Sequence, residues 1–196
     1  MSDNFQMLVD AEVTLGQADM VKQRVLAVLH LHDLIVREAD MECALGSLGY
    51  RPGPAVHQLY ELAENELPFW DQITCGVELR IGRDFNHWAY GTSCEGYSCP
   101  LCSHEFEPED EDLAEVLSEA IGEWVDQSGP ALVPCPSCTK QVPVSQWRCT
   151  PPLGFGNLSV VFWNWPPLDS PFWRIDILEL IRQATLHPLI RTHGHL

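Results

Sequence analysis

Two short cysteine motifs constrain this chain more than any other feature of its sequence. Cys99-Pro100-Leu101-Cys102 is followed, 32 residues later, by Cys135-Pro136-Ser137-Cys138. Each Cys-x-x-Cys turn can place two sulfurs around one ion, and two turns supply the four thiolates that structural zinc prefers. We therefore predict one structural Zn²⁺ bound by these four cysteines. Such a set leaves no position for the water that a catalytic zinc needs.

The two Cys-Pro-x-Cys motifs resemble the knuckles of a zinc ribbon, over about residues 94–148. The resemblance implies that each knuckle lies at the tip of a β-hairpin and that the ion clamps two hairpins together. The sequence departs from the common pattern in two ways. The stretch between the motifs has room for a full helix, and Ser103 and Thr139 stand where a glycine often follows the second cysteine.

Other interpretations of the cysteines remain open from the sequence alone. The two motifs could be redox dithiols, the four thiols could be free, or the ion could be iron, which accepts the same ligands. His104, Cys94 and Cys149 lie close enough along the chain to replace one of the four ligands.

The start of the chain favours a reducing compartment. Met1 to Asp10 contains acids and no Lys or Arg, so it lacks the basic start and apolar middle of a secretion signal. No apolar run approaches the roughly 18 residues that cross a bilayer. We expect a cytoplasmic protein, in which paired cysteines indicate a metal site rather than disulfides.

The net charge of the chain limits the classes of molecule that it is expected to bind. The formal net charge is −17, and the basic residues include only two lysines, Lys22 and Lys140. Affinity for nucleic acid and for anionic membranes comes from Lys and Arg, so we expect neither partner. If the chain binds a protein, that protein is expected to be basic.

The acids are concentrated around the cysteine motifs. No Lys or Arg occurs between Asp84 and Thr139. The segment from Glu105 to Asp126 is rich in Asp and Glu, and four thiolates around one divalent cation add about two more negative charges. This block predicts either a solvated helix face or a docking surface for a basic protein.

Hydrophobic periodicity predicts an α+β fold: a mixed α/β body with an inserted four-cysteine zinc-ribbon lobe that carries a helix. We expect three parts: residues 1–90, the zinc lobe at 91–150, and residues 151–196, which pack on the first part. Helices are expected at about 19–39, 54–63 and 109–127, and from Ser170-Pro171 onward. Strands are expected at 7–15, 73–83, 158–165 and 189–192.

Two of these strands carry specific expectations. Ile73 to Arg83 alternates between apolar and polar residues, which predicts one buried and one wet face, with Cys75 as a small core residue. Trp163 and Trp165 are two residues apart, so a continuous strand would point both to the same face.

No catalytic motif stands out, so we predict a non-enzymatic protein-binding module with an acidic docking surface. One concrete form is an immunity protein that neutralises a basic toxin. A zinc-ribbon adaptor in transcription or RNA processing is the second hypothesis and requires four arginines to converge: Arg51, Arg80, Arg83 and Arg148. The third is an enzyme with a site between the α/β parts, near His57, Glu78 or His87.

Overall fold

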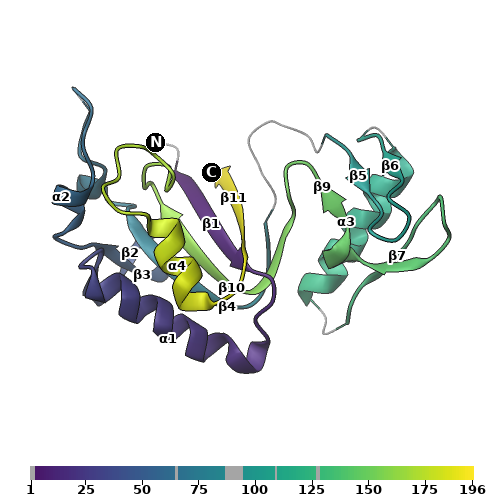
Figure 1. Ribbon diagram of the computed structural model, residues 1–196, viewed down its shortest axis with the longest axis horizontal. Helices are drawn as coiled ribbons and strands as arrows, with labels where there is room; N and C mark the ends of the chain where they lie inside the picture. The colour runs from purple at the N-terminus through teal and green to yellow at the C-terminus, as the bar shows by residue number, and fades with distance from the viewer. Residues whose placement is uncertain (1–2, 65, 87–94, 109, 127–128) are drawn as a thin grey trace.

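A six-stranded antiparallel sheet forms the body of the molecule in the computed structural model, and a smaller lobe lies beyond one end of that sheet (Figure 1). The structure describes residues 3–64, 66–86, 95–108, 110–126 and 129–196. The predicted α+β class is confirmed.

The sheet draws its strands from both ends of the chain, in the order β11-β1-β10-β4-β3-β2. Its strands are β1 (Asn4–Asp10), β2 (Ile35–Ala44), β3 (Ser47–Pro52), β4 (Gly76–Asn86), β10 (Gly154–Trp163) and β11 (Leu189–His195). β4 and β10 are neighbours, pairing from Gly76↔Trp163 to Asn86↔Gly154. The described residues between these two strands in the chain form the lobe.

Two helices, α1 (Leu15–Leu31) and α4 (Ile177–Thr185), cover one face of the sheet (Figure 1). The main core lies between them and the sheet, and includes Val25, Leu29, Val77, Phe162 and Ile181. The short helix α2 (Val56–Leu59) and the 3₁₀ turn η1 (Phe69–Asp71) close one end of this core. Removing this apolar surface from water is the main stabilising term of the body.

The first helix is shorter than its sequence predicts. The expected helix at 19–39 begins earlier, at Leu15, and ends at Leu31. Asp33 then adopts a left-handed backbone with φ of 48°, which a helix cannot continue through. The chain turns and enters β2 at Ile35, so the end of the helical prediction is wrong.

β4 has a buried residue on each of its faces. Cys75, Val77 and Leu79 are buried in the core as predicted. The strand begins at Gly76, so Ile73, which is 73% exposed, precedes it, and Glu78 on the opposite face of the strand is only 6% exposed. The expectation of one wet face is therefore wrong. Glu78 is compensated, because Arg80 donates two hydrogen bonds of 2.9 Å to its carboxylate and Trp163 Nε1 donates a third of 3.0 Å.

Two expectations for the last third of the chain also fail. β10 ends at Trp163, and Asn164 has φ of 54°, so Trp163 and Trp165 pack into different clusters. The last helix does not begin at Ser170. It begins at Ile177, where the Asp176 side chain caps it by accepting a 2.8 Å hydrogen bond from the backbone N–H of Glu179.

The lobe is built from short elements around one helix. They are β5 (Tyr97–Ser98), β6 (Glu105–Phe106), α3 (Glu111–Asp126), β7 (Leu132–Pro134), β8 (Gln141–Pro143), η2 (Val144–Gln146) and β9 (Arg148–Cys149). α3 confirms the helix expected at about 109–127. Leu113, Leu117 and Trp124 of α3 are buried in the lobe core, which also contains Phe155 of β10. The lobe is therefore packed against the end of the sheet.

Candidate metal centre

The two cysteine motifs fold into turns with the same hydrogen bonds. In the first, the N–H of Ser103 donates to the carbonyl of Cys99 at 2.9 Å, and the N–H of Cys99 donates to the carbonyl of His104 at 3.1 Å. In the second, Thr139 donates to Cys135 at 2.8 Å, and Cys135 donates to Lys140 at 2.9 Å. Equivalent hydrogen bonds at two distant sites indicate two copies of one local structure, as the zinc-ribbon resemblance implies.

The residue after each second cysteine lies in the left-handed region. Ser103 has φ of 58° and Thr139 has φ of 61°. These are the two positions where the sequence lacks the glycine that is common in zinc ribbons. The turn is therefore formed without glycine, at the steric cost that a Cβ carries in this conformation.

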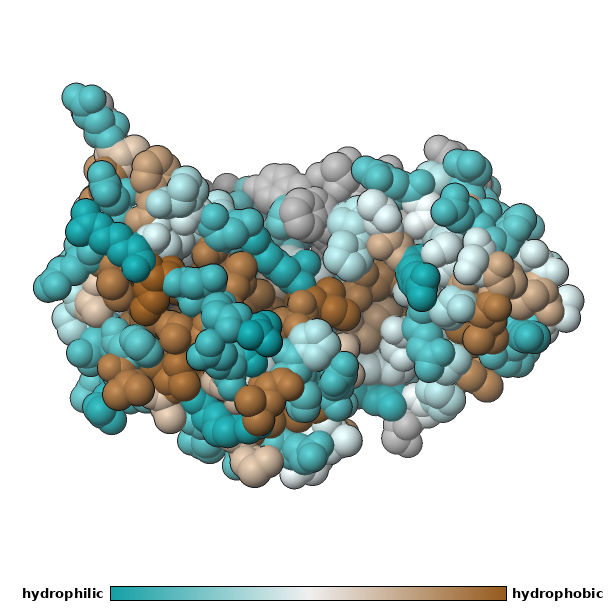
Figure 2. Space-filling model, viewed as in Figure 1, coloured by the Kyte–Doolittle hydropathy of each residue, from teal (hydrophilic) through white to brown (hydrophobic). Residues whose placement is uncertain are grey.

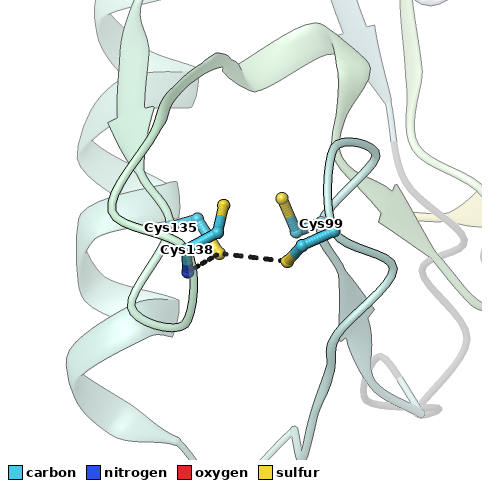
Figure 3. Close-up of side chains that lie close together, drawn as sticks. Cys99, Cys135 and Cys138 are labelled. Atoms are coloured by element: carbon cyan, nitrogen blue, oxygen red, sulfur yellow. Dashed lines mark hydrogen bonds between the residues drawn. The ribbon is translucent and has the colours of Figure 1, made fainter.

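The four sulfurs converge. The two turns face each other, and their cysteine side chains point into the space between them (Figure 3). All four Sγ atoms lie within 4.8 Å of one another, and Sγ of Cys102 is 3.8 Å from Sγ of Cys135. A tetrahedral Zn²⁺ site with bonds of about 2.3 Å requires sulfurs about 3.8 Å apart. The donor set and the separation of Cys102 from Cys135 thus fit a tetrathiolate ion.

Backbone N–H groups support the negative charge of the sulfurs. Burial raises the pKa of Cys135 to about 11. Burial acts in the same direction on Cys99, but hydrogen bonds from the backbone of Leu101 and Cys102 outweigh it and lower the pKa of that thiol to about 7. The N–H of Cys138 lies 3.5 Å from Sγ of Cys135. Such bonds spread the charge of metal-bound thiolates.

Two of the three alternative ligands, His104 and Cys149, do not join this group. Among the described residues, the group contains Cys99, Cys102, Cys135 and Cys138 alone. The ring of His104 instead packs edge-on against Phe106, with centroids 4.7 Å apart. Cys149 lies on β9 and Cys94 lies outside the described residues. The four predicted cysteines can therefore hold a metal ion without a further ligand from the described residues.

The four cysteines differ in their exposure to solvent. Cys99 and Cys135 are buried, Cys138 is half-buried and Cys102 is exposed. Because four protein sulfurs already complete a tetrahedron, a bound ion would keep no position for substrate. The arrangement is suited to holding two chain segments together.

An acidic stripe runs along α3, in the same lobe as this centre. We use the name for Asp112, Glu115, Glu119, Glu123 and Asp126, all of which are exposed. At 100° per residue their directions fall within an arc of about 80° on the side of the helix away from the lobe core. None of the five forms an ion pair within the part of the chain that the structure describes.

Three of the four arginines proposed for a nucleic-acid surface have acceptors within the chain, and the fourth, Arg148, is exposed on β9. Arg51 pairs with Asp40, and Arg80 pairs with Glu78. Arg83 donates to backbone carbonyls at the end of α3, at 2.8 Å from Trp124 O and 2.6 Å from Gly129 O. These guanidinium groups are committed to acceptors within the chain.

Two of the residues proposed for an enzyme site, His57 and Glu78, lie in different parts of the body. His57 stacks on Trp70 with ring centroids 4.6 Å apart, whereas Glu78 is buried under the opposite face of the sheet with Arg80 and Trp163. His87 lies outside the described residues. The structure does not bring His57 and Glu78 together.

Sequence reasoning missed the role of Arg83 in the lobe. Its acceptors are carbonyl groups 41 and 46 residues further along the chain. Any residue type provides such a group, so no sequence pattern marks the contact. The only available signal was that Arg83 is the last basic residue before a long stretch without Lys or Arg.

Comparison with protein-family models, curated proteins and solved structures gives no match for this chain. Within the described residues, no helix has both the length and the apolar character needed to cross a membrane. The arguments on function therefore rest on the cysteine cluster and on the surface around it.

Proposed function

We propose that this protein is a non-enzymatic binding module whose lobe is held by one structural Zn²⁺ and docks a basic protein through the acidic stripe of α3. The observation that carries the proposal is the alignment of five exposed carboxylates on one helix face with no cation paired to them among the described residues. A basic partner would supply the missing positive charges.

The zinc ion is the first part of this proposal. Soft thiolate ligands, a tetrahedral separation and backbone N–H support favour Zn²⁺ over hard cations such as Mg²⁺ or Ca²⁺. The ion would join the turn at Cys99 to the turn at Cys135. It would thereby stabilise the small core against which α3 packs.

The energetics of the stripe support a functional role. Carboxylates three and four residues apart on a helix repel one another, at about 0.2–0.5 kcal/mol per pair. Two of the five, Glu123 and Asp126, also lie at the negative end of the helix dipole, in a last turn that contains no basic residue. These carboxylates lower the stability of the helix, and their presence is consistent with a surface used for recognition.

The surface of the lobe fits the same role. The face of the lobe in view is mostly hydrophilic, whereas apolar residues gather on the body (Figure 2). A charged surface such as the acidic stripe attracts an oppositely charged partner over a distance and raises the rate of encounter. An immunity protein that neutralises a basic toxin is the specific form that we favour. The separate engagement of Arg51, Arg80 and Arg83 makes a nucleic-acid adaptor less well supported.

The test compares three immobilised proteins for capture from lysate of the source cell. They are the natural chain, a stripe variant (Glu115→Gln, Glu119→Gln and Glu123→Gln), and a control (Glu12→Gln, Glu38→Gln and Glu64→Gln). Both variants lose three negative charges, and all six positions are exposed. We expect a basic protein to bind the natural chain and the control and to be lost from the stripe variant.

The captured protein is then purified and titrated at several salt concentrations. Its dissociation constant should rise with salt, because screening weakens exposed charge pairs. A partner that binds the stripe variant as well as the control, or whose affinity ignores salt, would count against docking through α3. Metal analysis of the same samples tests the zinc separately.

A further inference from the structure

Two sulfurs of the candidate metal centre lie close together but differ in their exposure to solvent. Sγ of Cys102 is 3.8 Å from Sγ of Cys135, and the two residues are 33 positions apart in the chain. Cys102 is exposed, whereas Cys135 is only 1% exposed. The turns that carry them face each other across the space into which the cysteine side chains point (Figure 3). A reagent in solution can therefore reach Cys102, and Cys135 is the shielded sulfur beside it.

An accessible thiolate next to a second thiol is the arrangement in which cysteine oxidation is reversible. An oxidant converts the accessible sulfur to a sulfenic acid, and the second thiol condenses with it to a disulfide before further oxidation occurs. A disulfide bond is about 2.05 Å long, so the sulfurs of Cys102 and Cys135 need to approach each other by about 1.8 Å. The two turns therefore form a candidate oxidation site as well as a candidate metal site.

We propose that Cys102 and Cys135 form a disulfide when hydrogen peroxide acts on the metal-free centre, and that this disulfide replaces the ion as the clamp of the lobe, a regulation that rests on the zinc-held lobe of the proposed function. The thiolate of Cys102 attacks one peroxide oxygen, the O–O bond breaks, and a sulfenic acid forms as hydroxide leaves. The thiolate of Cys135 then attacks that sulfur, the S–S bond forms, and the S–O bond breaks with loss of a second hydroxide. The two hydroxides take up the two thiol protons. Two thiols and one peroxide thus give one disulfide and two waters, with two electrons passing from sulfur to oxygen.

The ion and the disulfide exclude each other, because both use the same two sulfurs. Zinc binds the thiolate form of cysteine, and a sulfur in a disulfide is no longer a thiolate. After cross-linking, only Cys99 and Cys138 of the four cysteines keep their thiols, which is half of a tetrahedral set. A bound ion in turn occupies Cys102 and withholds it from the oxidant. Zinc and peroxide therefore compete for one pair of cysteines.

The position of the disulfide in the chain gives it the same structural effect as the ion. It would close a loop of 33 residues that contains α3, whereas a disulfide within one turn would join Cys99 to Cys102 and leave the two turns separate. Closing a longer loop removes more conformational entropy from the unfolded chain. A chain that loses its zinc under oxidising conditions would thus keep α3, and the acidic stripe with it, in a folded lobe.

The test treats the full chain, after a chelator has removed its metal, with one equivalent of hydrogen peroxide and then blocks the remaining thiols with iodoacetamide. Because no Lys or Arg occurs between Asp84 and Thr139, the digest needs a protease that cuts after glutamate, which separates the two turns at Glu105. Mass spectrometry should find a peptide pair that joins Cys102 to Cys135. Amide hydrogen exchange of α3 should be at least tenfold slower in this product than in the reduced metal-free chain. The zinc-loaded chain, treated in the same way, should stay uncross-linked.

Single serine variants give matched controls, because each removes one of the same four ligands. Cys138→Ser and Cys99→Ser keep the proposed pair and should cross-link at the rate of the natural chain. Cys102→Ser removes the accessible sulfur and should slow cross-linking between the two turns at least tenfold. All three are compared without metal, so their weakened zinc binding does not affect the result.

Disulfides formed within each turn would overturn the proposal. So would a Cys102→Ser variant that cross-links the two turns as fast as Cys138→Ser, or peroxide that cross-links the zinc-loaded chain as fast as the metal-free chain. The zinc content of the untreated chain is measured separately. Its absence would refute the zinc of the proposed function, and the peptide that joins Cys102 to Cys135 would still decide between a disulfide across the turns and disulfides within them.

Discussion

Arg83 and Trp124 join the sheet to the lobe through two contacts of one guanidinium group. Arg83 Nη1 donates a 2.8 Å hydrogen bond to the carbonyl of Trp124, and the guanidinium carbon lies 4.7 Å above the centre of the Trp124 ring. Arg83 belongs to β4, and Trp124 lies in the last turn of α3. The last turn of α3 has no basic residue of its own, so the basic group that Arg83 brings to this negative helix end comes from another element.

Replacing Arg83 should loosen the lobe. Arg83→Met keeps most of the side-chain length but removes the donors to Trp124 and Gly129. Hydrogen bonds that involve a charged group contribute about 1.5–3 kcal/mol, so we expect α3 to lose about that much free energy of opening. Amide hydrogen exchange of α3 measures it. Arg174→Met, which breaks an exposed surface pair, should change stability by less than about 1 kcal/mol. Equal effects of the two variants would contradict the role of Arg83.

Metal removal should unfold the lobe and spare the body. The lobe core and the main core are separate clusters of buried residues. After chelation we expect α3 to exchange its amide protons rapidly while β1 and β10 stay protected. Metal analysis should find one zinc per untreated chain and none in Cys135→Ser. Cys75→Ala is the control, because it alters the main core and should leave the zinc content unchanged. Absence of metal from the natural chain would remove the centre altogether.

Thiol reactivity should separate the two kinds of cysteine. Burial raises the pKa of Cys75 to about 12, so its thiol stays protonated and unreactive at pH 8. Cys102 is exposed and should react with iodoacetamide only after its metal is removed. Mass spectrometry of alkylated peptides, with and without a chelator, measures both sites. Labelling of Cys75 before Cys102 in chelated protein would refute this assignment.

Glycine at the two left-handed positions should stabilise the lobe. A Cβ in this conformation destabilises the folded state by about 1–2 kcal/mol. Replacement by glycine removes this strain, but part of the stabilisation is lost because glycine raises the conformational entropy of the unfolded chain. We expect Thr139→Gly to add about 0.5–1 kcal/mol, and Ser103→Gly somewhat less because serine is not β-branched. Ser137→Gly is the control in the same turn. Ser137 is not among the left-handed residues, so this change should destabilise the lobe. Thermal unfolding of the zinc-bound variants measures this order of stabilities.

The two ends of the acidic stripe should respond oppositely to loss of one charge. Glu123→Gln removes a negative charge from the last turn of α3 and should stabilise the helix by about 0.3–1 kcal/mol. Asp112→Asn removes one from the first turn and should destabilise it by a similar amount. Both variants lessen the repulsion within the stripe, so only the helix dipole can give them opposite signs. Hydrogen exchange of α3 at low salt measures it, and a common sign for both variants would refute the explanation.

Features that depend on near neighbours in the chain could be predicted from the sequence alone. The spacing within Cys99–Cys102 and within Cys135–Cys138 sets two turns that repeat the same hydrogen bonds. The apolar period of α3 sets one buried face, and its acids occupy the other. Such features follow from the geometry of a few consecutive residues, which is the same wherever the segment lies.

Which distant segments meet became known from the fold of the whole chain. It paired β4 with β10, buried Glu78 against Trp163, and placed Gln6 against a turn about 160 residues away. It also separated Trp163 from Trp165 through a single left-handed residue, Asn164. These outcomes depend on the total burial and hydrogen bonding of the whole chain. A polar residue is buried only where a partner from elsewhere compensates it, and no local pattern identifies that partner.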